Sequence, residues 1–193
     1  MKIVLIDYGA GNVQSVKYAL NRLGIEPSLT KDHDEIKSAD KVIFPGVGSA
    51  KAAMEQLKAS GLDVLIPTLT QPVLGICVGM QLMCKHSEEG DVQCLGIIDS
   101  EVKKFKPGLK IPHMGWNNIS DLKSPLFQGL STEHQVYFVH SYYVPVNEYT
   151  IATTGYSNDF SAAIKKDNFY AVQFHAEKSG DIGEQILKKF LAL

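Results

Sequence analysis

The sequence predicts an α/β protein with a mostly parallel central sheet, helices on both faces, and an additional region of mixed or antiparallel strands. In the first half, short continuous apolar runs alternate with segments whose apolar residues recur at helical spacing. Continuous apolar strands separated by helices are typical of a parallel sheet that is buried on both faces. The second half has short segments rich in β-branched and aromatic residues with turns between them, which predicts the mixed strands.

The elements follow from these patterns in chain order. In the first half, strands are expected at 2–6, 26–29, 41–44 and 72–76, and helices at 12–23, 49–59 and 78–85. In the second half, strands are expected at 102–105, 116–119, 136–139, 149–156, 161–165 and 170–174, followed by a helix at 181–191. Because no repeat, low-complexity tract or linker interrupts the pattern, residues 1–193 are expected to form a single domain.

The composition limits the partners and the compartment. Apolar residues make up 45% of the chain, and the net charge of −2 gives no electrostatic reason to expect nucleic acid or a membrane surface as partner. Three cysteines without a CxxC pair suit a reducing compartment. No apolar run approaches the ~20 residues of a membrane span, and the N-terminus lacks the features of a signal peptide. The sequence therefore predicts a cytoplasmic protein.

Cys77 is the candidate nucleophile. It lies in the segment Gly75-Ile76-Cys77-Val78-Gly79, directly after a predicted strand and before a predicted helix. Such a turn holds a nucleophile in a strained backbone, and the helix N-terminus favours the thiolate. The amide of Val78 is placed to face an oxyanion. The alternative for Cys77 is a buried core thiol. Cys84 is expected in the core, and Cys94 in the core or a loop.

His175 is the candidate base. It ends an apolar strand, and Glu177 follows two residues later, so the carboxylate can orient the imidazole. Active sites of parallel sheets gather at the carboxyl ends of the strands, where Cys77 and His175 both fall. The alternative is a surface pair. His140, the main rival base, has no carboxylate near it in sequence and is interpreted as part of a pocket wall.

The remaining histidines have no predicted catalytic role. They lie in polar surroundings and are assigned to local structure: His33, His86, His113 and His134. No pair of histidines has the spacing of zinc ligands, so neither a metal nor another cofactor is expected.

A second glycine-rich turn, Pro45-Gly46-Val47-Gly48, follows the third strand. It is too short for a phosphate-binding loop and lacks that motif's lysine. Glycines at the end of a strand let a backbone amide turn toward a ligand, so this turn and Val78 are expected to form a two-donor oxyanion hole. A plain tight turn is the alternative.

Taken together, these motifs resemble the class I, or triad-type, glutamine amidotransferases. The resemblance rests on GxCxGxQ at 75–81, on the PGVG turn and on the strand-borne His-x-Glu pair. The segments 7–12, 114–117 and 137–142 narrow it to the subfamily of glutaminase subunits of imidazole glycerol phosphate synthase, in histidine biosynthesis. The resemblance spans nearly the whole chain and implies a flavodoxin-like fold.

The resemblance also implies roles for single residues. Cys77, His175 and Glu177 would be the catalytic triad. The L-glutamine substrate would be bound by Gly48, Gln81, Glu89, His140, Ser141 and Tyr142. The oxyanion hole would be formed by Gly46, Val47 and Val78. The partner interface would include Asn12, Trp116, Tyr137 and Lys178.

The partner implied by the resemblance is a (β/α)₈ cyclase subunit, which forms a heterodimer with the glutaminase, receives its ammonia through a channel and adds a lyase activity to the complex. One departure stands in the triad segment, where Ala176 replaces the proline common in the family and leaves the backbone before Glu177 freer. The alternatives are a subunit serving another synthase, in polysaccharide sugar amidation or vitamin B6 formation, a non-catalytic glutamine-binding or partner-binding regulator, or a cysteine peptidase.

Overall fold

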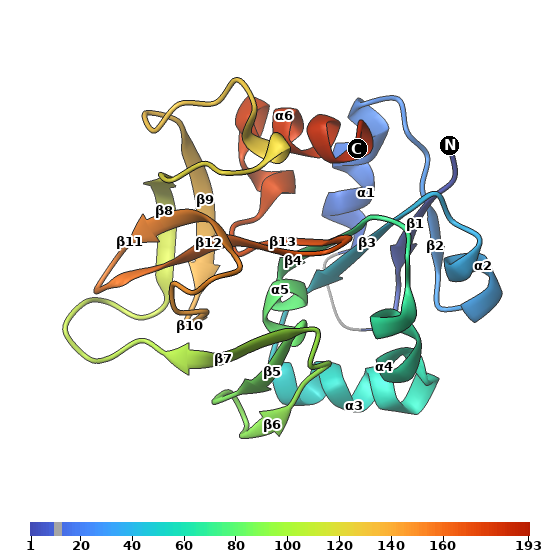
Figure 1. Ribbon diagram of the computed structural model, residues 1–193, viewed down its shortest axis with the longest axis horizontal. Helices are drawn as coiled ribbons and strands as arrows, with labels where there is room; N and C mark the ends of the chain where they lie inside the picture. Colours follow the sequence, from blue (N-terminus) through green and yellow to red (C-terminus); the bar gives the residue numbers. More distant parts are fainter. Residues whose placement is uncertain (10–12) are drawn as a thin grey trace.

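The computed structural model describes residues 1–9 and 13–193. In this part of the chain, the main sheet runs in the order β11 (Thr150–Gly155), β12 (Asp159–Lys166), β13 (Phe169–Val172), β4 (Val73–Cys77), β3 (Lys41–Gly46), β1 (Ile3–Ile6) and β2 (Ser28–Thr30) (Figure 1). The strands from β13 to β2 are parallel, and β12 and β11 join them antiparallel. This arrangement confirms the predicted mixed α/β fold with a large, mostly parallel sheet.

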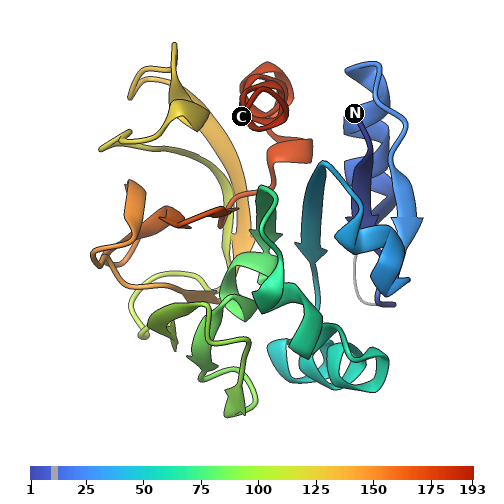
Figure 2. The ribbon, with the colours of Figure 1, turned by 45° about the vertical axis from the view of Figure 1, so that its right-hand side comes forward.

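Helices cover both faces of the main sheet. In Figures 1 and 2, α1 (Val13–Arg22) and α6 (Gly180–Leu191) lie on one face, and α3 (Ala50–Ser60) and α4 (Leu62–Leu65) lie on the other. All residues of β1, β3 and β4 are buried, as expected for strands covered on both sides. No described helix is both long and apolar enough to cross a membrane.

Two smaller sheets contain the other described strands. One has the order β10 (Tyr142–Tyr143), β7 (Ile98–Lys104), β5 (Cys84–Ser87) and β6 (Val92–Gln93), and the other pairs β8 (His113–Asn118) with β9 (Gln135–His140). Short helical turns were not predicted: α2 (His33–Lys37), α4, η1 (Ile66–Thr68), η2 (Pro125–Phe127) and η3 (Ala176–Lys178).

The helix predicted over 78–85 is wrong in its second half. Helix α5 (Val78–Leu82) ends one turn early, and Cys84 begins strand β5. Cys84 pairs with Ile98 of β7, so a contact made across the chain overrides the local helical pattern. Cys84 is fully buried, as predicted, and Cys94 lies partly buried in the loop after β6.

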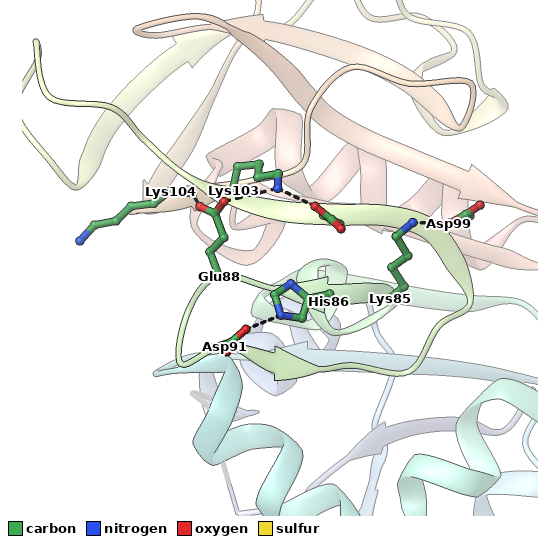
Figure 3. Close-up of polar contacts among 8 residues, drawn as sticks. Lys85, His86, Glu88, Asp91, Asp99, Lys103 and Lys104 are labelled. Atoms are coloured by element: carbon green, nitrogen blue, oxygen red, sulfur yellow. Dashed lines mark hydrogen bonds and ion pairs between the residues drawn. The ribbon is translucent and has the colours of Figure 1, made fainter.

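The lysines of the basic run at 103–106 are partly or fully exposed, whereas Phe105 between them is buried. Figure 3 shows Lys103 between two carboxylates, with Nζ 3.4 Å from Glu88 Oε1 and 2.5 Å from Glu101 Oε2. Lys85 and Asp99 form a similar exposed pair at 2.8 Å. Exposed ion pairs of this kind contribute little to stability, about 0–1 kcal/mol each.

Candidate active site

Cys77 sits on a strained turn at the end of β4. Its backbone has φ 55° and ψ −111°, a conformation that non-glycine residues rarely adopt. In the sheet it lies beside Gly46 of β3, and a Cβ on Gly46 would come within 2.6 Å of the Gly79 nitrogen. The glycines therefore permit α5 to begin directly on top of β3. This geometry matches the predicted strand-to-helix turn around the thiol.

His175 and Glu177 form a buried pair. His175 Nδ1 lies 2.7 Å from Glu177 Oε1, and the two side chains are 3% and 2% exposed. The His175 backbone N–H donates to the Tyr137 carbonyl of β9 at 2.9 Å, and this bond fixes the position of the backbone that carries the imidazole ring. Within the described part of the chain, Glu177 Oε2 has no hydrogen-bond partner. The carboxylate's charge is therefore balanced chiefly by His175.

Burial and the two neighbours Cys77 and Glu177 act on the pKa of His175 in opposite directions. Burial by itself lowers this pKa, but hydrogen bonds and charges from Cys77 and Glu177 outweigh it and raise the pKa of His175 to about 10. The imidazolium is therefore favoured beside the sulfur and the carboxylate. An imidazolium beside a cysteine sulfur can supply a proton to a leaving group, and the thiolate is the nucleophilic form of such a sulfur.

A cavity of about 330 Å³ opens over Cys77 and His175. Its wall includes most of the residues that the sequence predicted for the site: Val47, Gly48, Cys77, Val78, Gln81, Glu89, His140, Ser141, Tyr142, His175 and Lys178. Pro112 and Val139 also line it and were not predicted. Gly46 packs behind the turn, against Val78 and Gly79, and does not line the cavity. A cavity of this size suits a small molecule.

Two polar residues of the cavity wall are held by fixed partners. Gln81 Nε2 donates to the Tyr142 carbonyl and to Gln173 Oε1, each at 3.0 Å. Glu89 Oε2 accepts from the Ala50 N–H at 2.8 Å, at the start of α3. Because their positions are fixed before any ligand arrives, these side chains are preorganised for polar contacts.

The assignment of His113 to polar surroundings is wrong. His113 is 4% exposed and stacks on Phe138 and Tyr156, with ring centroids 4.9 and 4.2 Å apart. Its Nδ1 lies 3.0 Å from His140 Nε2, while His140 Nδ1 donates to the Tyr142 carbonyl at 2.7 Å. Burial lowers the pKa of His113 to about 4 and that of His140 to about 3. Both rings are therefore neutral near pH 7, and both nitrogens of His140 are already engaged in hydrogen bonds, to the Tyr142 carbonyl and from His113.

Two of the residues predicted for the partner interface, Trp116 and Tyr137, lie side by side on β8 and β9. Trp116 is 53% exposed on β8 and meets Tyr137 of β9 edge to face, at 5.9 Å between ring centroids. Met114, two residues before Trp116 and on the same side of β8, is 62% exposed. Lys178 lines the cavity. Asn12 lies outside the described residues.

Sequence reasoning missed Gln173, which is fully buried after β13 and donates from Nε2 to Cys77 Sγ at 3.8 Å. The available signal was a single polar residue inside the apolar segment 171–174. No group of three or more His, Cys, Asp or Glu side chains in the described residues is arranged to hold a metal ion.

Comparison with known proteins defines the class. Residues 4–193 match the family Glutamine amidotransferase class-I. A solved structure of a glutamine amidotransferase has the same fold, with a TM-score of 0.79 and 18% identity over 100% of this chain and 98% of that one. PurLQS from Thermotoga maritima also shares it, with a TM-score of 0.74 and 15% identity over 99% of this chain and 97% of that one. The chain therefore belongs to the class-I glutamine amidotransferase family.

Full-length relatives narrow the class further. The chain is 61% identical to imidazole glycerol phosphate synthase subunit HisH of Bacteroides fragilis (strain YCH46), over 100% of both chains. It is 50% identical to the HisH subunit of Escherichia coli (strain K12), again over 100% of both. It is thus a member of the HisH group of glutaminase subunits, as the sequence motifs predicted.

Proposed function

We propose that this chain, acting as one domain of residues 1–193, hydrolyses L-glutamine through a thioester at Cys77 and delivers the ammonia to a (β/α)₈ cyclase subunit of imidazole glycerol phosphate synthase. The observation that carries the proposal is the buried His175–Glu177 pair beside Cys77, at the base of a cavity of about 330 Å³. A binding module has no need of a strained thiol next to an imidazole held at 2.7 Å by a carboxylate.

The reaction begins with the Cys77 thiolate and the His175 imidazolium. The sulfur attacks the side-chain carboxamide carbon of glutamine, and the carbonyl oxygen takes the negative charge. We assign the N–H groups of Val47 and Val78 to this oxyanion, because both residues line the cavity and helix α5 leaves the amide of its first residue, Val78, without a helical acceptor. With five residues, α5 contributes little helix dipole.

His175 then gives its proton to the departing nitrogen, the C–N bond breaks, and ammonia leaves a γ-glutamyl thioester on Cys77. The neutral imidazole takes a proton from water, the hydroxide attacks the thioester, and glutamate and the thiolate are released. Glu177 holds Nδ1 throughout, so Nε2 is the nitrogen that exchanges protons.

Gln81, Glu89 and the segment from His140 to Tyr142 are assigned to binding the amino-acid end of glutamine, since all of them line the cavity with polar atoms. Lys178 lies at the cavity wall, and Trp116 and Tyr137 lie on the exposed side of β8 and β9. We assign this side to the cyclase and the ammonia exit. We assign the heterodimer to the cytoplasm, because a chain with free thiols suits a reducing compartment.

The test is glutamate release from L-glutamine, measured for the chain alone and with its cyclase and the cyclase's nucleotide ligand. We expect strong stimulation by the liganded cyclase, and complete loss in Cys77→Ala with ammonia-dependent synthesis retained. Glutamine hydrolysis by Cys77→Ala would contradict the assignment of Cys77 as the nucleophile. Full glutaminase activity without the cyclase would contradict the coupling between the two subunits.

A further inference from the structure

Gln173 connects the sulfur of Cys77 to the substrate-binding wall. Its Nε2 donates to Cys77 Sγ at 3.8 Å, and its Oε1 accepts from Gln81 Nε2 at 3.0 Å. We propose that Gln173 is a positioning residue that holds the Cys77 sulfur as a thiolate and turns the Gln81 carbonyl toward the substrate. This inference deepens the proposed function and rests on it for the identity of the nucleophile.

The direction of these hydrogen bonds is set by one backbone carbonyl. The oxygen of Tyr142 can only accept, so the side-chain nitrogen of Gln81 must face it. The second hydrogen of that nitrogen points to Gln173, which must therefore present its oxygen to Gln81 and its nitrogen to the sulfur. A flipped Gln173 would set its side-chain nitrogen against that of Gln81, two donors facing each other.

The same carbonyl is held in place from the other side. It accepts from His140 Nδ1 at 2.7 Å, and His140 Nε2 in turn accepts from His113 Nδ1 at 3.0 Å. The orientation of Gln81, and through it that of Gln173, thus rests on a rigid buried network.

The burial of Gln173 shows that its amide has specific partners. At 0% exposure, a polar side chain without hydrogen bonds would cost several kcal/mol on transfer from water, roughly 2–7 kcal/mol. Its neighbours Val172 and Phe174 are fully buried apolar residues, so an apolar side chain would suit the packing. The position of the amide is therefore explained by the two groups it joins, Cys77 and Gln81.

Each contact has a chemical consequence. An N–H donated to sulfur stabilises the thiolate over the thiol, and the thiolate is the attacking form. With both N–H groups of Gln81 occupied, its Oε1 has no hydrogen-bond partner within residues 1–9 and 13–193, although Gln81 lines the cavity. A carbonyl oxygen held there can accept from the ammonium group of an amino acid.

The test measures alkylation of Cys77 by iodoacetamide in the full chain as a function of pH, followed by mass spectrometry of the Cys77 peptide. Alkylation needs no glutamine and no cyclase. In Gln173→Leu we expect the reaction profile to move about one pH unit higher, so that on its rising limb the rate at a given pH falls about tenfold. With the cyclase present, KM for glutamine should also rise, because Gln81 loses one of the two hydrogen bonds that fix its orientation.

The matched control is Gln71→Leu. Gln71 precedes β4, at the end of that strand opposite Cys77, and also uses its Nε2 in one partly buried hydrogen bond, to the Ile36 carbonyl at 2.8 Å. This variant loses a comparable bond but should keep the wild-type alkylation profile. A folded Gln173→Leu chain with the wild-type profile would overturn the inference.

A second variant covers the case in which Gln173→Leu does not fold. Gln173→Met keeps the length and flexibility of the side chain and should shift the profile in the same direction. A further measurement compares the wild-type chain with Cys77→Ser, both of which keep Gln173. The ¹⁵N chemical shift of the Gln173 side-chain amide should differ between the two proteins, and equal shifts would contradict the contact with the sulfur. If the chain shows the shifted alkylation profile and the chemical-shift change but hydrolyses no glutamine, the inference about Gln173 is supported and the proposed function is contradicted.

Discussion

Gly79 leaves no room for a side chain, because a Cβ there would overlap the carbonyl oxygen of Phe44. Phe44 belongs to β3 and Gly79 to α5, so the helix that follows Cys77 rests directly on the backbone of the neighbouring strand. This contact sets the height and angle at which the chain leaves β4. The strained conformation of Cys77 is the consequence.

Gly79→Ala should therefore displace α5 and with it the thiol. Because the obstacle is backbone rather than a flexible side chain, we expect a loss of about 1–3 kcal/mol in unfolding free energy and a loss of most glutaminase activity. Urea denaturation and glutamate release measure the two effects. Gly155→Ala is the control, since its Cβ would meet only the side chain of Asp159, at 3.0 Å. Wild-type activity in Gly79→Ala would contradict the packing argument.

Glu177→Gln should impair the acid–base step. Glu177 helps to raise the pKa of His175 to about 10 against the effect of burial, so removing its charge lowers that pKa. The imidazolium is lost as the pH rises through the His175 pKa, and the alkaline limb of kcat/KM should therefore move to lower pH. We expect kcat/KM to fall about 10²-fold or more. The control is Glu184→Gln, which breaks the ion pair between Glu184 on α6 and Arg22 on α1 and should leave kcat/KM and its alkaline limb unchanged. A Glu177→Gln variant that matched this control would exclude the orienting role.

The neutral pair His113–His140 predicts sensitivity to acid. The folded pKa values, about 4 and about 3, lie below the ordinary 6.5, so the unfolded chain binds more protons as the pH falls from 6.5 toward 4. The stabilisation is complete above about pH 6.5 and decreases below it, and for His140 the loss approaches about 1.4 kcal/mol per pH unit. Urea denaturation at several pH values measures this slope, which His113→Phe should make shallower. Equal unfolding free energies at pH 7 and pH 4.5 would contradict the prediction of acid sensitivity.

Trp116→Ala should weaken binding of the cyclase. Trp116 is 53% exposed and backed by Tyr137, and exposed aromatic residues of this kind often dominate an interface. We expect Kd to rise about 30-fold, which corresponds to about 2 kcal/mol, with unfolding free energy within about 0.5 kcal/mol of wild type. Isothermal titration calorimetry measures Kd. Val64→Ala, 72% exposed on α4, is the control, and equal effects of the two substitutions would place the interface elsewhere.

Ala176→Pro should be tolerated. Ala176 opens the turn η3, and no acceptor for its N–H is found among the described residues, so a proline removes no hydrogen bond. His175 has φ −86° and ψ 95°, an extended conformation that a following proline favours. We expect a gain of about 0.4–1 kcal/mol in unfolding free energy and little change in activity. A loss of stability would show that the buried methyl of Ala176 fits a space too tight for the ring.

The parts of the fold that could be predicted are those that depend on local pattern. Continuous apolar runs identified β1, β3 and β4, since a strand buried on both faces has no polar alternation. The end of α5 could not be predicted, because it is decided by the pairing of Cys84 with Ile98 in another strand. Propensity within one segment carries no information about such a partner.

The sequence by itself determined the turn around Cys77 and the adjacency of His175 and Glu177. Both features depend only on residues close together in the chain: the glycines that flank Cys77, and a pair of side chains two residues apart. Only the tertiary structure decided the polar network behind them. Gln173 meets Gln81 across 92 residues of sequence, and Gln81 meets the Tyr142 carbonyl across 61. A backbone carbonyl has no signature in the sequence, and whether a buried amide is satisfied depends on partners that folding brings together.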